Sequence, residues 1–278
     1  MRATSLAIAL FVAGCGPNVT HPSATHDPYR GGNSTPLSCV PNLDGQIDAN
    51  EMAPSFDAAE NFLVSPANQQ RSVDLVGRID SQGHRVWDWS APDSTDEVAS
   101  LSASPIAGKW YASSFPTDAF VVPIDAAKTT DGIYLHTDSA LSLLGVASAE
   151  QHPAGGETLM VYDAPVELYR FPLEPGAQWV SVGTVRNGLF RGLPYAGRDT
   201  YEVSVDASGD LVLPQLEFTQ AMRVRMHVTL EPSVGSPVSY WQVSFVSECF
   251  GEVARATSLD GEEQENFTTA AEVRRLGF

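Results

Sequence analysis

Basic residues are scarce in this chain, and lysine is the scarcest of them. Lysine and arginine together number 16 against 34 aspartates and glutamates, which gives a formal net charge of −18. The only lysines are Lys109 and Lys128. A surface this acidic repels nucleic-acid phosphates and anionic lipid headgroups. Nucleic acid is therefore excluded as a partner, and a basic patch is not expected to attach the protein to a membrane.

The chain also lacks the local motifs that mark an active site. It contains no G-x-S-x-G elbow, no P-loop and no dinucleotide-binding fingerprint. Its 6 histidines lie far apart, and only His136 with Asp138 and His84 with Asp88 form local pairs, which chance alone provides. We therefore predict a protein that is not an enzyme. A hydrolase whose site is dispersed along the chain is the alternative from another functional class.

Long apolar runs are missing except for a short one at the N-terminus. Residues 3–13 form an apolar segment behind Met1-Arg2, too short to span a bilayer and typical of an export signal. It ends in Val12-Ala13-Gly14-Cys15, which resembles the lipobox of bacterial lipoproteins. The resemblance implies a signal peptide over residues 1–14 and acyl chains, palmitate among them, on Cys15. The alternative is an ordinary secretory signal.

The same resemblance implies a location in the cell envelope. Several acyl chains anchor a protein stably without a spanning segment. Gly16, not an aspartate, follows Cys15, which favours the outer membrane of a Gram-negative bacterium. Residues 15–38 are rich in Pro, Thr, Ser, Asn and Gly and are expected to form a flexible tether. We expect the membrane to be a partner only through the lipid on Cys15.

Cysteine is scarce as well, with 3 in the whole chain. If Cys15 carries lipid, Cys39 and Cys249 remain as a pair, and an oxidising compartment favours a disulfide between them. This bridge would tie the N-terminal segment to the last third of the domain. Two separate buried thiols or a metal site are the alternatives, although no CxxC, HExxH or clustered Cys/His spacing is present.

Residues 39–55 contain a segment that resembles part of an EF-hand or dockerin-type calcium loop. With Gly45 at the sharp turn, the ligand positions fall on a set of polar residues, namely Asn42, Asp44, Gln46, Asp48 and Glu51. Val40 stands where the pattern requires aspartate, and the prolines at 41 and 54 disfavour flanking helices. The resemblance implies at most weak calcium binding. The alternative is a structured turn that holds no cofactor.

From residue 56 onward the chain is expected to be mostly β. Apolar and polar residues alternate over short segments broken by Gly, Pro, Asp and Asn, including a hairpin-like pair over residues 73–89 and a strand at 109–113. Residues 140–149 fit either a short helix or a strand. This pattern favours an antiparallel curved sheet, half-barrel or sandwich with few or no long helices. Trp110, Trp179 and Trp241 are predicted to lie in the core.

The last third shows a suggestive order of elements. A strand at residues 201–206 is followed by a turn, by Leu213-Pro214, by a strand at 218–226, by Tyr240-Trp241 and by Gly251-Glu252-Val253. This order resembles exported half-barrel proteins related to lipoprotein carriers and localisation factors. The resemblance covers residues 130–278 and implies a concave sheet whose inner face holds an acyl chain or another apolar ligand. The alternative is a concave side filled by side chains.

Together these features divide the chain and indicate a role. An N-terminal β region is expected over residues 56–129 and a C-terminal half-barrel-like β region over residues 130–278. We predict a membrane-anchored, extracytoplasmic lipoprotein that acts as a non-enzymatic binding or envelope-structure module. Its expected partner is an apolar ligand or an envelope protein. A carrier of a lipid-like ligand in the half-barrel groove is the alternative among binding proteins.

Overall fold

Nearly every segment with alternating apolar and polar residues forms a strand. The computed structural model describes residues 39–56 and 58–277. The strands, in chain order, are β1 (Glu60–Val64), β2 (Arg71–Ser72), β3 (Arg78–Ile79), β4 (Arg85–Asp88), β5 (Glu97–Leu101), β6 (Ser104–Pro105), β7 (Phe120–Pro123), β8 (Thr130–His136), β9 (Ala140–Ser148), β10 (Leu159–Arg170), β11 (Gln178–Phe190), β12 (Leu193–Val212), β13 (Glu217–Pro232), β14 (Val238–Ser247), β15 (Gly251–Ser258) and β16 (Thr269–Leu276). The helical elements of this part of the chain are the 3₁₀ turns η1 (Ala49–Met52) and η2 (Ala112–Ser114).

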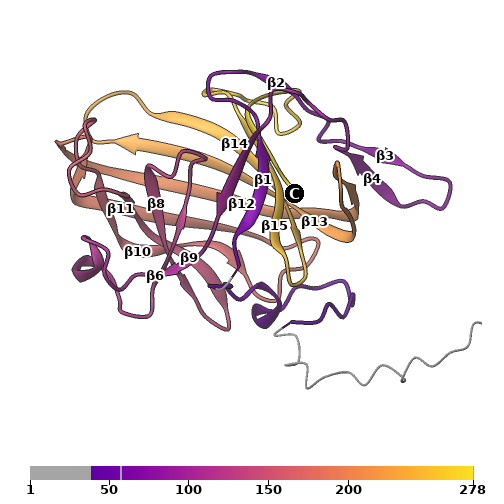
Figure 1. Ribbon diagram of the computed structural model, residues 1–278, viewed down its shortest axis with the longest axis horizontal. Helices are drawn as coiled ribbons and strands as arrows, with labels where there is room; N and C mark the ends of the chain where they lie inside the picture. Colours follow the sequence, from indigo (N-terminus) through magenta and orange to yellow (C-terminus); the bar gives the residue numbers. More distant parts are fainter. Residues whose placement is uncertain (1–38, 57, 278) are drawn as a thin grey trace, which may run out of the picture. The chain divides into compact units, whose positions relative to one another are not determined.

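All the strands belong to one sheet, which is curved and not closed (Figure 1). Its order is β5-β1-β16-β15-β14-β13-β12-β11-β10-β9-β8-β7-β6, and neighbours along this path are antiparallel where their register is defined. Strand β4 is the exception, because it pairs in parallel with the end of β12. The predicted fold class, a mostly β protein with an antiparallel curved sheet, is confirmed. Strands from both expected β regions contribute to the same sheet.

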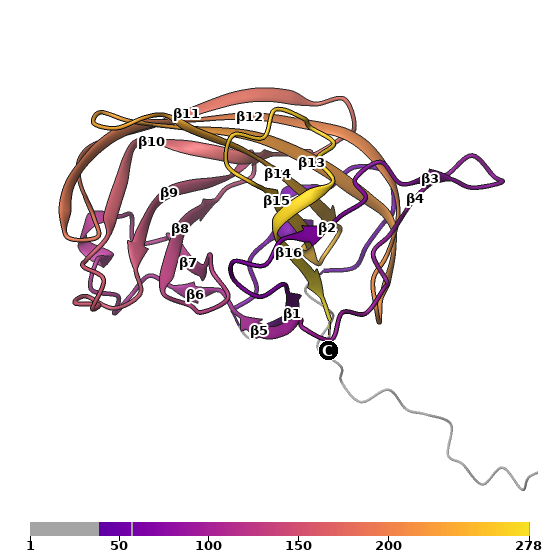
Figure 2. The same ribbon diagram turned by 90° about the horizontal axis from the view of Figure 1, so that it is seen from above.

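The sheet bends so far that its two ends come close together (Figure 2). Strands β5 and β6 stand at opposite ends of the strand order, yet only Ser102 and Ala103 separate them in the chain. Three peptide steps span at most about 11 Å. Register shifts in the ladders between β8 and β13 and in those of β14 to β16 add local bends, as bulges do.

A glycine permits the tightest contact on this bent path. A side-chain carbon built on Gly145 of β9 would stand 2.2 Å from the carbonyl oxygen of Met160 and 2.8 Å from the Phe115 ring. Both distances are shorter than non-bonded atoms tolerate, so the approach of β10 and of the Phe115 ring to β9 depends on the missing side chain.

The sheet is covered on both faces. One face of β13 carries Met222, Val224 and Met226, which pack in a core cluster with Ile47 and Met52 of the N-terminal segment. The opposite face of the neighbouring strands packs against residues 73–89, where Trp87 and Trp89 contact the ring of Phe245. Two smaller clusters lie under residues 106–121 and between β1 and β5. All four clusters and both pairing cysteines fall within Cys39–Phe278, which is one compact unit.

Two sequence expectations are resolved at the edges of this sheet. Residues 140–149 form strand β9, not a helix. The strand expected at 109–113 is wrong, because this segment is a turn that runs into η2. Its apolar residues point to buried sites of their own: Tyr111 is buried and donates a 2.6 Å hydrogen bond to Asp131, and Trp110 donates one of 2.9 Å to the carbonyl of Ser148. These side-chain contacts explain why the segment has the residue alternation of a strand although its backbone pairs with no strand.

The hairpin expected over residues 73–89 forms only in part. Strands β3 and β4 pair across the turn at residues 80–84, and the tip projects away from the rest of the sheet in both views (Figures 1 and 2). Residues 73–77 lie outside any strand because Gly77 has a φ of 68° and Asp74 bonds the following amides. Of the expected core tryptophans, Trp179 is buried, whereas Trp110 and Trp241 are partly exposed at the border of their clusters.

Candidate functional site

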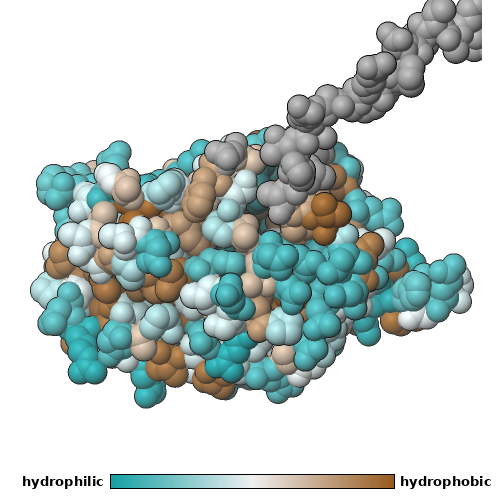
Figure 3. Space-filling model, turned by 90° about the horizontal axis from the view of Figure 1, so that it is seen from below, coloured by the Kyte–Doolittle hydropathy of each residue, from teal (hydrophilic) through white to brown (hydrophobic). Residues whose placement is uncertain are grey.

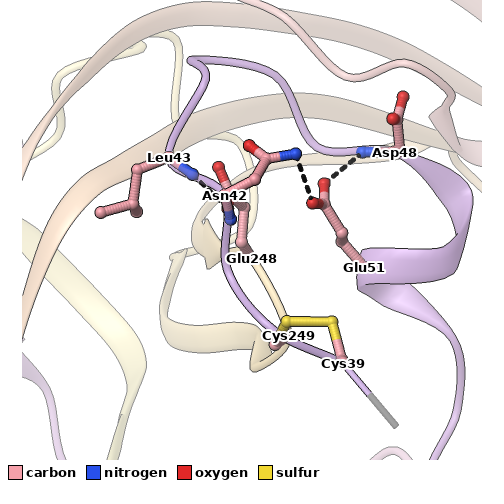
Figure 4. The surroundings of a disulfide bond; sticks show 7 residues. All are labelled: Cys39, Asn42, Leu43, Asp48, Glu51, Glu248 and Cys249. Carbon is pink, nitrogen blue, oxygen red and sulfur yellow. Dashed lines mark hydrogen bonds between the residues drawn. A yellow bond between two sulfur atoms is a disulfide. The ribbon is translucent and has the colours of Figure 1, made fainter. Parts of the chain in front are cut away.

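A disulfide holds the N-terminal segment against the end of the curved sheet. Cys39 and Cys249 are bonded with their Cα atoms 5.6 Å apart, across a separation of 210 residues. This spacing lies within the usual range for the bond, and the predicted pairing is confirmed. Figure 4 shows the bridge next to the loop that resembles a calcium site. The bridge therefore fixes that loop to the turn between β14 and β15.

Two glutamates hold this loop through hydrogen bonds: Glu51 of η1 and Glu248 of the turn between β14 and β15 (Figure 4). The Glu248 carboxylate accepts hydrogen bonds of 2.7 and 2.8 Å from the backbone amides of Asn42 and Leu43. The Glu51 carboxylate accepts one of 2.9 Å from the Asn42 side chain and one of 2.9 Å from the amide of Asp48. Burial raises the pKa of Glu51, the bond from Asp48 opposes this rise, and the charge of Glu248 adds to it. Both oxygens of Glu51 are therefore engaged by the protein itself.

The remaining calcium-loop candidates also bond within the turn. Asn42 accepts a hydrogen bond of 2.8 Å from the amide of Asp44, and Asp44 accepts one of 3.0 Å from the amide of Gln46. Such Asx turns are the local geometry that the alternative interpretation predicts. Over residues 39–56 and 58–277, no group of three or more His, Cys, Asp or Glu side chains is arranged to hold a metal ion. Weak calcium binding stays a prediction.

Beyond the loop, Ile47 fastens the segment to the sheet. Its side chain is buried and its backbone exchanges hydrogen bonds of 2.9 and 2.8 Å with Leu173. The ring of His136 bonds the carbonyl of Ala49 at 2.8 Å. His136 thus serves the packing of this segment, and η1 is held over one end of the concave face.

A cavity of about 260 Å³ lies beside this segment, inside the curve of the sheet. Its walls come from β1 and β5 at one end of the strand order, from β7 to β10 at the other, and from β13 to β16 between them. The link Ser102–Ala103, where the two sheet ends approach, also lines it. Curvature of the sheet therefore creates the cavity.

Apolar and polar side chains both line the cavity. The apolar lining includes Met52, Phe62, Leu101, Phe120, Val122, Ile124, Leu141, Leu168 and Met226. The polar lining includes Glu60, Tyr134, Tyr169, Gln242, Glu252, Arg255 and Arg274. A largely apolar pocket with a few convergent polar groups is the usual form of a small-molecule site.

Strands β15 and β16 contribute three charged residues to the polar lining, namely Glu252, Arg255 and Arg274. Arg255 stands across from Ser244 on one side and from Arg274 on the other. Arg274 donates hydrogen bonds of 3.0 and 2.7 Å to Glu272 and one of 2.9 Å to the carbonyl of Ile124. The arginine of β16 therefore has firm partners.

The second arginine, Arg255, is held more loosely. Its guanidinium nitrogens stand 3.5 Å from Glu252 and 3.6 Å from Glu272, while Glu252 accepts a shorter bond of 2.7 Å from Ser244. Its Nε is buried without a hydrogen-bond partner among the described residues. Burial lowers the pKa of Arg255, but the charges of Glu252 and Glu272 outweigh this effect and raise it. The side chain stays cationic and under-bonded at the cavity wall.

Glu60 adds a titratable group to the same cavity. Burial raises the pKa of its carboxyl to about 7, and repulsion by Glu252 contributes. The side chain nevertheless keeps exposed surface, because it faces the cavity and not the protein core. Nearby, burial also raises the pKa of Tyr134 to about 12 and that of Tyr169 further. A carboxyl with such a pKa in a cleft is a mark of functional sites.

The buried arginines elsewhere have tight partners within the protein. Arg223 and Arg225 bond Asp206 at 2.7–2.8 Å on the opposite face of β13, and Arg275 pairs with Asp96 beside a second cavity of about 240 Å³. These groups are consistent with structural roles. Arg255, in the cavity inside the curve of the sheet, differs from them because its buried Nε has no hydrogen-bond partner among the described residues.

Of the charged residues that line the cavity, sequence reasoning singled out Glu51 and missed the other four. Glu60, Glu252, Arg255 and Arg274 share no local motif and come from three strands. One signal was available: charged residues interrupt small apolar side chains at matching places in Gly-Glu-Val-Ala-Arg-Ala and Ala-Glu-Val-Arg-Arg-Leu. The other histidine pair, His84 with Asp88, lies at the projecting hairpin, away from the cavity lining.

Comparison with protein-family models, with curated proteins and with solved structures found no match for this chain. Within the described part of the chain, none of the helices has the length and apolar character needed to cross a membrane. The functional assignment must therefore come from the geometry of the cavity and from the chain's own sequence signals.

Proposed function

We propose that this protein is an extracytoplasmic binding protein that holds a small amphipathic molecule inside its curved sheet. The observation that carries the proposal is the cavity of about 260 Å³, which is lined by apolar side chains and by an arginine whose buried Nε has no hydrogen-bond partner among the described residues. Apolar area provides the affinity in such sites, and a few polar groups orient the ligand. This proposal joins the two binding roles that the sequence predicted.

The proposal includes attachment to the outer membrane of a Gram-negative bacterium through acyl chains on Cys15. The lipobox supports this attachment, and the disulfide between Cys39 and Cys249 fits an oxidising compartment. Cys15, the signal over residues 1–14 and the tether over 15–38 lie outside the described residues. The cavity and the anchor are therefore tested separately.

Native mass spectrometry tests the cavity. The unit Cys39–Phe278 contains every core cluster and the disulfide, so it can be exported to the periplasm behind a cleavable signal and purified without its lipid. We expect a bound mass of roughly 140 Da, scaled to this cavity from an engineered one of about 150 Å³ that accommodates benzene. Denaturation should release it. A bare mass after incubation with envelope extract would contradict the proposal, and parallel spectra with calcium test the loop over residues 39–55.

A second candidate, an envelope-structure module with a protein partner, has a specific observation in its favour. Val40, Leu43 and Phe250 flank the disulfide and are exposed by 66%, 47% and 47%. On the face drawn in Figure 3, however, the apolar side chains of the described residues form small groups among hydrophilic ones. Val40→Asp combined with Leu43→Asp should abolish cross-linking to an envelope protein if this role is correct, and should leave ligand binding unchanged, because neither residue lines the cavity.

Glu60 and Glu252 favour the third role, a hydrolase with a dispersed site. Two carboxyl groups in one pocket, one of them with a pKa of about 7, can divide acid and base functions between them. Hydrolysis of nitrophenyl esters or glycosides by the purified domain, lost in Glu60→Gln, would support this role. We rank it below binding because Glu252 is engaged by Ser244 and Arg255.

A further inference from the structure

We propose that the cavity selects a medium-chain carboxylate, with its carboxylate on Arg255 and its apolar chain against the apolar side chains of the lining. This inference rests on the proposed binding function and names its ligand class. It starts from the number of hydrogen bonds that the two cavity arginines form.

Arg274 has fewer N–H donors free for a ligand than Arg255. A guanidinium carries five N–H donors. The N–H of Nε and the two of Nη2 on Arg274 already bond Glu272 and the carbonyl of Ile124. No hydrogen bond of Arg255 is found among the described residues, and its nearest carboxylate oxygens are 3.5 and 3.6 Å away. Buried donors are normally satisfied, so Arg255 calls for an acceptor that comes from outside the chain.

The planar fork of a guanidinium matches a carboxylate, which accepts two parallel N–H bonds. Glu252 and Glu272 hold this position only loosely, since their oxygens are 3.5 and 3.6 Å from the guanidinium and each accepts shorter bonds from Ser244 or Arg274. An ammonium headgroup has no acceptor for the N–H groups of Arg255, and both arginines of the lining repel its charge. Protonated Glu60, with a pKa of about 7, leaves the pocket less negative and favours an anion further.

The apolar lining sets the length of the chain. It includes Phe62, Leu101, Phe120, Leu141 and Met226. A cavity of about 150 Å³ holds the six carbons of benzene, so one of about 260 Å³ holds roughly ten non-hydrogen atoms. Octanoate has this size, with two carboxylate oxygens and eight carbons.

The test is calorimetric titration of the domain Cys39–Phe278 at pH 6 with octanoate, octanol and octylamine. We expect octanoate to bind tightest. Arg255→Met should weaken octanoate binding about tenfold or more, as loss of a charge-assisted pair does, and should change octanol binding less than about twofold. Arg255→Lys keeps the charge without the fork and should fall between these values. Arg186→Met, at an exposed position on β11, is the matched control and should bind like the unaltered domain.

Two results would overturn the inference while leaving the proposed function in place. One is tighter binding of octylamine than of octanoate, and the other is octanoate affinity that is unchanged in Arg255→Lys and Arg255→Met. If none of the three amphiphiles binds, the inference and the proposed function both fail. Thermal melting of each variant checks folding, and Arg255→Lys, which preserves the cation beside Glu252 and Glu272, remains informative if Arg255→Met does not fold.

Discussion

Charged side chains inside the curved sheet fall into two groups. Arg223, Arg225 and Asp206 saturate one another with hydrogen bonds of 2.7–2.8 Å, which compensates for their loss of water. Arg255 and Glu60 are not compensated in this way, and both face the cavity. The lack of partners for these two side chains lowers the free energy of unfolding, and a bound ligand would restore part of that loss. Residues that weaken the fold in this manner are frequent at functional sites.

Glu60→Gln is expected to stabilise the domain at pH 8 and to leave it nearly unchanged at pH 5. The folded-state pKa of Glu60, about 7, lies above the ordinary glutamate pKa of 4.5. The folded protein therefore keeps a proton that the unfolded chain releases between these two pH values. The free energy of unfolding therefore falls as the pH rises through this window. Glutamine removes that dependence.

Thermal melting at both pH values, read by circular dichroism, measures the effect. Glu217→Gln, at an exposed position of β13, is the control and should show no such difference between the two pH values. An equal change of melting temperature at pH 5 and pH 8 in Glu60→Gln would contradict the assignment.

At the scale of strands, alternation identified most elements but not their partners. The long strands β12 to β15 lie where apolar and polar residues alternate, and the 109–113 segment shows the same alternation without being a strand. Its aromatic side chains are buried by tertiary contacts, with Tyr111 bonded to Asp131. Local pattern reports which side chains are buried; it does not report whether neighbouring backbone is available for pairing.

Gly145→Ala should destabilise the domain by about 1–3 kcal/mol or more, because the added methyl group would stand 2.2 Å from the carbonyl oxygen of Met160. Gly155→Ala is the matched control, since a side-chain carbon there meets nothing within 4 Å. Urea denaturation gives both free energies. Equal values for the two variants would mean that β10 does not approach β9 as closely as described.

Replacing both Cys39 and Cys249 by serine should lower the free energy of unfolding by up to about 5 kcal/mol, the chain-entropy value for a loop closed by 210 residues. The loop over residues 42–51 should become more accessible to protease, because the bridge and the bonds from Glu248 hold it together. Denaturant titration and limited proteolysis measure the two effects. Dithiothreitol on the unaltered domain should reproduce both, and no change in either experiment would contradict the bridge.

For the whole molecule, the site is a consequence of curvature. The sixteen strands of the described residues form one sheet, which bends until β5 and the link Ser102–Ala103 that leads into β6 complete the wall of the cavity. The N-terminal segment closes one end through the disulfide and the contacts of Ile47. Any displacement of the sheet ends would change the cavity, so ligand binding and stability of the whole domain should be linked.

Cys15→Ala is expected to abolish palmitate labelling and to shift the protein from the membrane fraction to the soluble envelope fraction. The reason is that the acidic domain has no basic surface to retain it on anionic lipid. Fractionation of cells that express each form measures the shift, and Cys39→Ser, which leaves the lipobox intact, is the control. Retention of Cys15→Ala in the membrane fraction would contradict a lipid anchor.

The sequence by itself determined the class of fold and the pairing of two cysteines, because alternation and cysteine parity are local or additive properties. From the net charge it predicts, in addition, that nucleic acid is not a partner. It also predicted the turn at residues 42–51, whose hydrogen bonds span few residues. Only the tertiary structure decided that Glu60, Glu252, Arg255 and Arg274 share one cavity. These residues meet through strand register and sheet curvature, and both depend on contacts between segments that are up to about two hundred residues apart in the chain.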